Sequence, residues 1–322
     1  MANLSTVADM IEYVLYTSGQ TTSSSDSFYN RAIEHINRAR LELIKGVSPL
    51  DPTKRTTFKW AIKYPPYTLV LQPKITTTSV SVTNNNSTVT FSAIIVTSMA
   101  GYHFIVDDEY DVYRISSHTA GTDTATLDSV YTGDTNSSAT FKLVKVEYEL
   151  GSNDIIRLIS PINAYRTTVN NNPNYKIYGI DEDRFDADFP LADIYSGTPD
   201  YFKVVKIADG NWTVVFNKYS KENLIKIEYN IIQLPSDLTS SSAATEILIP
   251  KEYRQVCCDW ASSLLLTDKS DDKATNLLQK AQAGYSSMVM DSKNLYSDID
   301  PSFGRMISRE DEYNDGIRWL YR

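Results

Sequence analysis

The residues of this chain that could do chemistry are mainly carboxylates, which gather in two clusters. The first cluster is Asp107, Asp108, Glu109 and Asp111, and the second is Asp181, Glu182, Asp183, Asp186 and Asp188. Oxygen-rich loops of this type bind Ca²⁺ in some proteins, and paired carboxylates hydrolyse glycosidic bonds in others. Neither cluster has the spacing or the glycine of a helix–loop–helix calcium site. We therefore interpret both as loops that face solvent or the lumen of an assembly, with a cation site and a catalytic pair as alternatives.

The histidines and cysteines form no metal-binding or nucleophilic pattern. None of His35, His103 and His118 lies at ligand spacing from another histidine or a cysteine. Cys257 and Cys258 are adjacent within a helical pattern, so we interpret them as small core or interface residues. The 12 glycines make no phosphate-binding loop or dinucleotide fingerprint. We expect no enzyme activity, no cofactor and no bound metal.

Composition narrows the class of protein further. The chain has 322 residues, 42% of them hydrophobic, and a formal net charge of −9. An acidic chain gains little affinity for nucleic acid from counterion release, so sequence-specific DNA binding is not expected. The charge would suit a surface along which DNA slides, but it is also ordinary for soluble proteins. The sequence has neither an apolar run of about eighteen residues for a membrane span nor the order of a signal peptide.

Both ends of the chain carry helical patterns. In residues 1–50 the first helix, capped by Asn3 or Ser5, has an apolar stripe from Val7 to Leu15, and a second stripe runs from Tyr29 to Leu43. Residues 245–292 contain a second pair of helices with similar stripes. Neither helical hairpin can bury its stripe alone. We therefore predict that the two hairpins pack on each other as a four-helix bundle built from both chain ends.

Strand patterns fill the middle of the chain. Short alternating runs separated by turn residues predict an inserted small β-barrel or sandwich over residues 67–150. Residues 151–199 are rich in Asn, Asp and Pro and predict a long loop region, and residues 200–235 predict a further β-hairpin group. The predicted fold class is α+β.

Residues 293–322 predict an extended C-terminal arm with few periodic apolar residues. Its end concentrates Trp, Tyr and Arg, the residue types that dominate the hot spots of protein interfaces. These candidate docking residues are Tyr313, Ile317, Arg318, Trp319, Leu320, Tyr321 and Arg322. The alternative is a tail that folds back on its own helices or frays.

The order of hydrophobic anchors in the second half of the chain resembles the head-to-tail adaptor (connector) proteins of tailed bacteriophages. The anchors are Pro199, Tyr201, Trp212 to Phe216, Leu224 to Tyr229, Leu234, Pro235, Leu238, Ile249, Pro250, Tyr253, Leu265, Asp268, Ala281 and Tyr285. The two N-terminal helical patterns fit the start of the same family. The β module within 67–150 is an insertion that small adaptors lack.

The resemblance implies a structural virion protein of the neck, assembled in the host cytoplasm and placed between capsid and tail. Its subunits would form a ring of roughly twelve copies through repeated heterologous contacts. The arm would dock on the portal protein, stopper or tail proteins would attach to the ring, and genomic DNA would pass through the channel without specific binding. The acidic loop Asp181 to Asp188 would face that channel. Alternatives are another neck ring, such as a stopper or tail terminator, or a carbohydrate-binding or hydrolysing virion protein.

Overall fold

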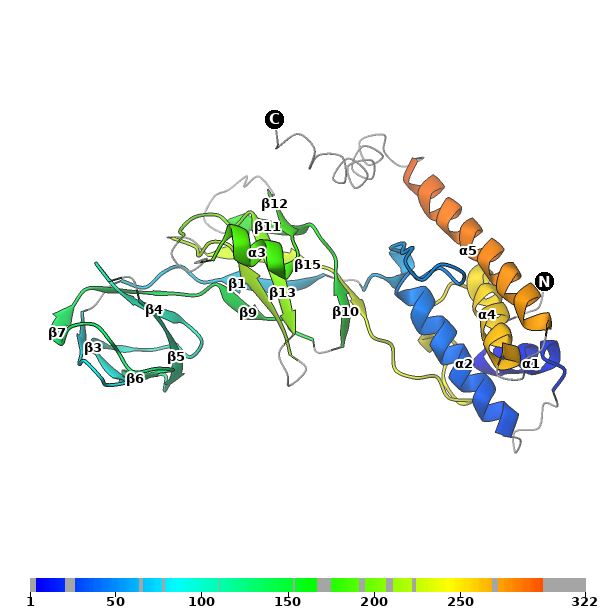
Figure 1. Cartoon of the computed structure of the whole chain (residues 1–322), viewed down its shortest axis with the longest axis horizontal. Helices are drawn as coiled ribbons and strands as arrows, with labels where there is room; N and C mark the ends of the chain where they lie inside the picture. Colours follow the sequence, from blue (N-terminus) through cyan, green and yellow to red (C-terminus); the bar gives the residue numbers. More distant parts are fainter. Residues whose placement is uncertain are drawn as a thin grey trace. The chain divides into compact units, whose positions relative to one another are not determined.

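The computed structural model describes residues 4–20, 27–63, 66–76, 79–109, 111–152, 154–166, 175–190, 195–206, 211–221, 224–267 and 272–297. The chain forms two compact units. A helical unit comes from both chain ends, before Tyr64 and after Ile231, and a β unit comes from the residues between. The blue and orange helices in Figure 1 belong to the helical unit.

The helical unit contains four α-helices and three short 3₁₀ helices among its described residues. The elements are α1 (Val7–Thr17), α2 (Ser27–Ile44), η1 (Lys59–Ala61), η2 (Ala244–Ile247), η3 (Lys251–Tyr253), α4 (Arg254–Thr267) and α5 (Lys273–Ser297). The cap of α1 is Thr6 rather than the predicted Asn3 or Ser5. Thr6 Oγ1 accepts from the Asp9 N–H at 3.1 Å, and Asp9 Oδ2 accepts from the Thr6 N–H at 2.8 Å, which completes a capping box.

One hydrophobic core joins the two chain ends. The buried residues of α1 are the predicted stripe, Val7, Met10, Ile11, Val14 and Leu15. They share a core with Ala32, Ile36, Ala39 and Leu43 of α2, Cys257, Cys258, Ala261 and Leu265 of α4, and Ala281, Tyr285 and Met288 of α5. The Tyr285 hydroxyl also donates to the Gly46 carbonyl at 2.6 Å.

The prediction of a four-helix bundle is wrong. α4 packs extensively on α1, α2 and α5, but α5 has no comparable contact with α1 or α2 among the described residues. A bundle needs each helix to pack along two neighbours of similar length. At 1.5 Å per residue, the 11 residues of α1 span about 17 Å and the 25 residues of α5 about 37 Å. Small residues on several faces of α4, such as Ser262 and Ser263, are also buried, which makes α4 a central helix.

The β unit contains a seven-stranded, nearly closed, barrel-like sheet with the order β1-β15-β11-β12-β13-β14-β9. Its strands are β1 (Tyr67–Leu71), β9 (Glu147–Glu149), β11 (Ile162–Arg166), β12 (Tyr175–Gly179), β13 (Tyr201–Lys206), β14 (Trp212–Phe216) and β15 (Ile225–Tyr229). The two edge strands meet where the Gln72 N–H, next to β1, donates to Tyr148 Oη of β9 at 2.9 Å. This contact covers edges that would otherwise invite pairing with other chains.

A second barrel-like sheet has the order β7-β2-β3-β6-β5-β4-β8. Its strands are β2 (Val80–Val82), β3 (Thr88–Ile95), β4 (His103–Val106), β5 (Val112–His118), β6 (Thr122–Leu127), β7 (Asn136–Ala139) and β8 (Phe141–Val144). The two strands at the ends of this order, β7 and β8, are separated only by Thr140, so the sheet curls almost onto itself. Phe91, Phe104 and Phe141 lie in its core. The ring centroid of Phe141 is 5.2 Å from that of Phe91 and 5.7 Å from that of Phe104.

The structure divides the middle of the chain differently from the sequence prediction. Both β1 and β9 lie within residues 67–150 but belong to the first sheet, and β13, β14 and β15 of the range 200–235 join that sheet as well. Residues 151–199 contain β10 (Ile155–Leu158), β11, β12 and α3 (Glu182–Asp188) in place of the predicted loop, and β10 pairs with β16 (Ile231–Gln233). Such pairings join distant parts of the sequence, so local patterns do not reveal them. Among the described helices, none is long and apolar enough to cross a lipid bilayer.

Candidate functional site

The predicted docking tip lies outside the described residues. Tyr313, Ile317, Arg318, Trp319, Leu320, Tyr321 and Arg322 all belong to the segment 298–322. Their role therefore stays a prediction, and the site described below is the one that the second acidic cluster helps to build.

The second acidic cluster is a short helix rather than the predicted loop. Asp181 caps α3 by accepting from the Arg184 N–H at 3.0 Å, and Glu182 and Asp183 occupy the first turn. Acidic side chains are favourable at both positions because they face the unpaired N–H groups of a helix start. Phe185, only 1% exposed, anchors the helix on the β unit, and its ring lies 5.5 Å from that of Phe189.

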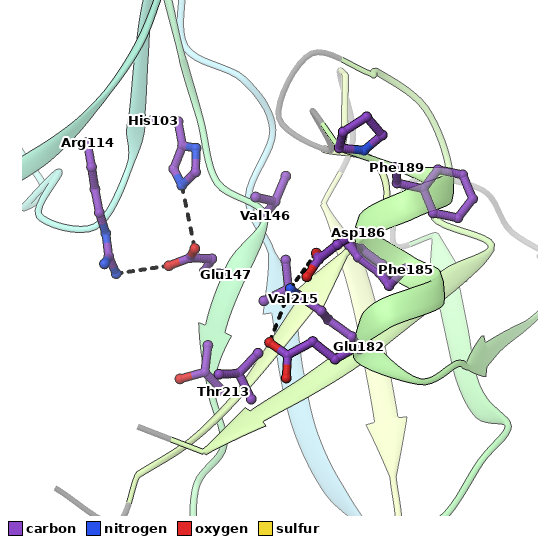
Figure 2. Close-up of a pocket in the computed structure, with 13 residues that line it drawn as sticks. His103, Arg114, Val146, Glu147, Glu182, Phe185, Asp186, Phe189, Thr213 and Val215 are labelled. Carbon is purple, nitrogen blue, oxygen red and sulfur yellow. Dashed lines mark hydrogen bonds and ion pairs between the residues drawn. The ribbon is translucent and has the colours of Figure 1, made fainter. Parts of the chain in front are cut away.

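A pocket of about 460 Å³ lies beside α3. Five strands and α3, or residues next to them, contribute its lining, which mixes charged and apolar side chains. The lining residues are His103, Arg114, Val146, Glu147, Glu182, Phe185, Asp186, Phe189, Pro190, Lys203, Val205, Thr213 and Val215. Figure 2 shows Glu182, Phe185 and Asp186 projecting from α3 on one side and His103, Arg114 and Glu147 on the other.

On the α3 side, Lys203 pairs with both carboxylates that enter the pocket. Its ammonium lies 2.6 Å from Asp186 Oδ1 and 3.5 Å from Glu182 Oε1, and its side chain is only 13% exposed. It also lies 5.5 Å from the centre of the Phe185 ring, at the distance of a cation–π contact. The two carboxylates remain more than half exposed, so the pairs hold α3 on β13 without removing the acidic groups from the surface.

On the opposite side, Glu147 of β9 connects the two sheets. Its Oε2 lies 2.9 Å from the Arg114 guanidinium of β5, and its Oε1 lies 3.8 Å from His103 Nε2 of β4. The interaction with His103 and the charge of Arg114 hold the pKa of Glu147 below its ordinary value, although burial opposes this shift. Apolar contacts among Ile105, Val144, Val146, Tyr219 and their neighbours lie at the same junction.

The ion pairs that line this pocket hold structural elements together. Lys203 holds α3 on β13 through Asp186, and the pair of Arg114 with Glu147 joins β5 to β9. In the part of the chain that the structure describes, no group of three or more His, Cys, Asp or Glu side chains could hold a metal ion. Asp188 pairs with Arg184 at 3.4 Å on the outer surface of α3, and Asp183 lies in the exposed first turn.

The first acidic cluster lies in a turn and accepts hydrogen bonds from Tyr131 and Thr132. Thr132 Oγ1 donates to Asp111 Oδ2 at 2.6 Å, and the Tyr131 hydroxyl donates to Glu109. Burial and this carboxylate raise the pKa of Tyr131. Asp108 has a positive φ of 68°, a conformation that Asp tolerates better than most residues in tight turns. These hydrogen bonds therefore stabilise the turn between β4 and β5.

The remaining candidates lie at separate places. The thiols of Cys257 and Cys258 are buried, which confirms their interpretation as core residues, and burial raises the pKa of Cys257 to about 12. His118 is also buried, and its Nδ1 accepts from the Met99 N–H at 3.2 Å. His35 lies half-buried on α2, in the other unit from His103.

Sequence reasoning identified Glu182 and Asp186 but missed Lys203, Glu147 and Arg114. The last three lie on β13 and β9 of the first sheet and on β5 of the second, and only the tertiary fold brings them near α3. The one local signal was alternation in these strands, which places charged and apolar side chains on opposite faces. No protein-family model matches this chain, and no curated protein resembles it at a significant level.

Proposed function

We propose that this chain is a structural subunit of a bacteriophage neck, a head-to-tail adaptor that forms a ring below the portal and extends the DNA channel. The observation that carries the proposal is the single core shared by the two chain ends. Because the helical unit closes on itself, the β unit can vary as an insertion while the helices and the segment after them keep one role. A chain in which the helical unit keeps one role while the β unit varies suits a subunit of a larger assembly.

The partners follow from this role. A ring of roughly twelve subunits arises when one heterologous contact repeats around a closed rotation. The portal is the proposed partner of the C-terminal tip, stopper or tail proteins bind the ring, and DNA passes through without specific binding. The net charge of −9 supports this last point because an acidic surface repels the phosphate backbone.

The test is to remove the arm and measure head-to-tail joining. A chain that ends after Asp300 keeps every described helix and should remain folded by circular dichroism, yet it should fail to join DNA-filled heads. A matched variant keeps the full length but replaces Ile317, Trp319, Leu320 and Tyr321 by serine. If the apolar tip is the anchor, this variant fails as well, because burying such side chains contributes about 25 cal/mol per Å².

Electron microscopy of heads incubated with each variant gives the readout. The full chain should appear as a ring on the portal, and both arm variants should be absent from it. Normal joining by the chain that ends after Asp300 would refute the role of the arm, whereas binding of the full chain to another neck position would refute the adaptor assignment.

A further inference from the structure

The helical unit has an aromatic groove of about 240 Å³ between η1, η3 and α5. Three aromatic rings, a proline and a methionine line it, with Lys59 and Glu252 as its charged residues. The apolar residues are Phe58, Trp60, Pro250, Tyr253 and Met288.

Contacts behind the groove fix its shape before anything binds. Phe58 is 1% exposed and stacks on Trp60 with ring centroids 5.3 Å apart and planes 13° apart. Tyr285 packs edge-on against Phe58 at 5.8 Å. On the other side, the Tyr253 hydroxyl donates to Asp291 Oδ2 at 3.1 Å. A groove held in this way requires little ordering when it takes a ligand.

The groove fits a segment that carries an aromatic side chain, because aromatic rings pack favourably on one another edge-to-face or offset-stacked.

The C-terminal arm of this chain carries aromatic side chains and follows a helix that lines the groove. Met288 and Ser292 of α5 line the groove, and α5 ends at Ser297, before the last 25 residues. The distance back along the helix from Ser297 to Met288 is about 14 Å at 1.5 Å per residue. Trp319 is far enough along the chain to span roughly 70 Å when extended at about 3.3 Å per residue. Its neighbours Arg318 and Arg322 complement Glu252 at the groove.

We propose that this groove holds the tip of the same chain's arm, with Trp319 entering it. Tethering on one chain gives the tip an effective concentration of order millimolar at the groove, which favours it over the arm of a second copy in dilute solution. That the portal then competes for the tip rests on the proposed function. The binding of the tip in the groove does not rest on the proposed function.

The test places one cysteine at the groove and one on the arm of the full chain. Ser292→Cys with Leu320→Cys is the reporter pair, and Ser287→Cys with Leu320→Cys is the matched control, because Ser287 is an exposed residue elsewhere on α5. The native thiols Cys257 and Cys258 are buried. With oxidised glutathione as the oxidant, the reporter pair should form an intramolecular disulfide about tenfold faster than the control, since the groove raises the local concentration of the tip.

Two further measurements keep the outcome decisive. Trp319→Ala in the reporter background should lower the rate to that of the control, and an excess of a synthetic peptide of residues 313–322 should slow the reporter by competing for the groove. Equal rates for reporter and control would overturn the proposal. A disulfide between two chains would also overturn it and assign the groove to the arm of a second copy. Failure here leaves head joining intact, so it is distinguishable from failure of the proposed function.

Discussion

Asn37 joins the two chain ends through a pair of hydrogen bonds, and removing it tests whether those ends fold as one unit. Its Nδ2 donates to the Leu238 carbonyl at 3.0 Å, and its Oδ1 accepts from the Leu238 N–H at 2.8 Å. The two residues are 201 positions apart, and Leu238 is only 2% exposed. Arg40, one turn further along α2, donates to the carbonyls of Ser236 and Glu246 in the same segment.

The substitution Asn37→Ala should lower the free energy of unfolding by about 2 to 4 kcal/mol. Each of the two lost hydrogen bonds contributes about 1 kcal/mol, and a buried backbone group left without a partner costs about 1 to 3 kcal/mol. Asn37 is itself only half-buried, so water can replace part of what is lost, which places the expected value near the lower limit. Asn37→Asp retains the acceptor for the Leu238 N–H but sets a carboxylate beside the Leu238 carbonyl, so it should not restore stability.

Urea unfolding followed by far-ultraviolet circular dichroism measures this effect, because four of the five described α-helices lie in the helical unit. Asn30→Ala is the control, since Asn30 is an exposed residue of the same helix. A difference of less than about 0.5 kcal/mol between the two alanine variants would refute the reasoning, because that is the usual limit for surface substitutions.

Two further perturbations probe other contacts. Glu147→Gln should cost about 0.5 to 1 kcal/mol at neutral pH, because Arg114 is half exposed. The pKa of Glu147 is lowered in the folded protein, so its contribution to stability is present above the ordinary carboxyl pKa and is lost as the pH falls through the folded pKa. Variant and parent should therefore converge in stability in acid, as measured by urea unfolding followed by tryptophan fluorescence. An unchanged difference in acid would contradict this. Gly284→Ala places a Cβ 2.5 Å from Val256 Cγ2, so overpacking of about 1 to 3 kcal/mol should exceed the helix gain of about 1 kcal/mol. In a Val256→Ala background the same change should raise the urea midpoint, and a stabilising effect in the parent would show that α4 and α5 separate easily.

Local patterns predicted the parts of this fold that depend on one segment alone. The stripe of α1 is visible because its apolar residues recur at helical spacing on one face. The cysteines could be placed in the core because they lie inside an apolar helical run. The same reasoning did not predict that Asp259, Ser262 and Ser263 of α4 are buried as well, because their types suggest a surface position. Asp259 is accommodated because the Tyr13 hydroxyl donates to it at 2.8 Å.

The sequence predicted the candidate site only in part, because the residues that pair with α3 come from strands that are distant in the sequence. The composition of 181–188 suggested a solvated loop because aspartate is a poor helix former in a helix interior. The favourable cap at Asp181 and the burial of Phe185 reverse that preference. Neither effect reveals that Lys203 would face Glu182 and Asp186, because the sequence alone does not specify which strand lies beneath α3.

The geometry of α3 also sharpens the hypothesis about DNA in the channel. Asp181, Glu182, Asp183, Asp186 and Asp188 carry five negative charges, but Lys203 and Arg184 pair with three of these residues. The helix therefore presents a smaller excess of negative charge than the sequence suggests. Exposed charges act on a phosphate backbone only within roughly 8 Å at physiological ionic strength. An acidic surface of this kind can keep DNA from adhering where it passes close by, whereas guiding DNA across a wide channel would require charges from many subunits acting together.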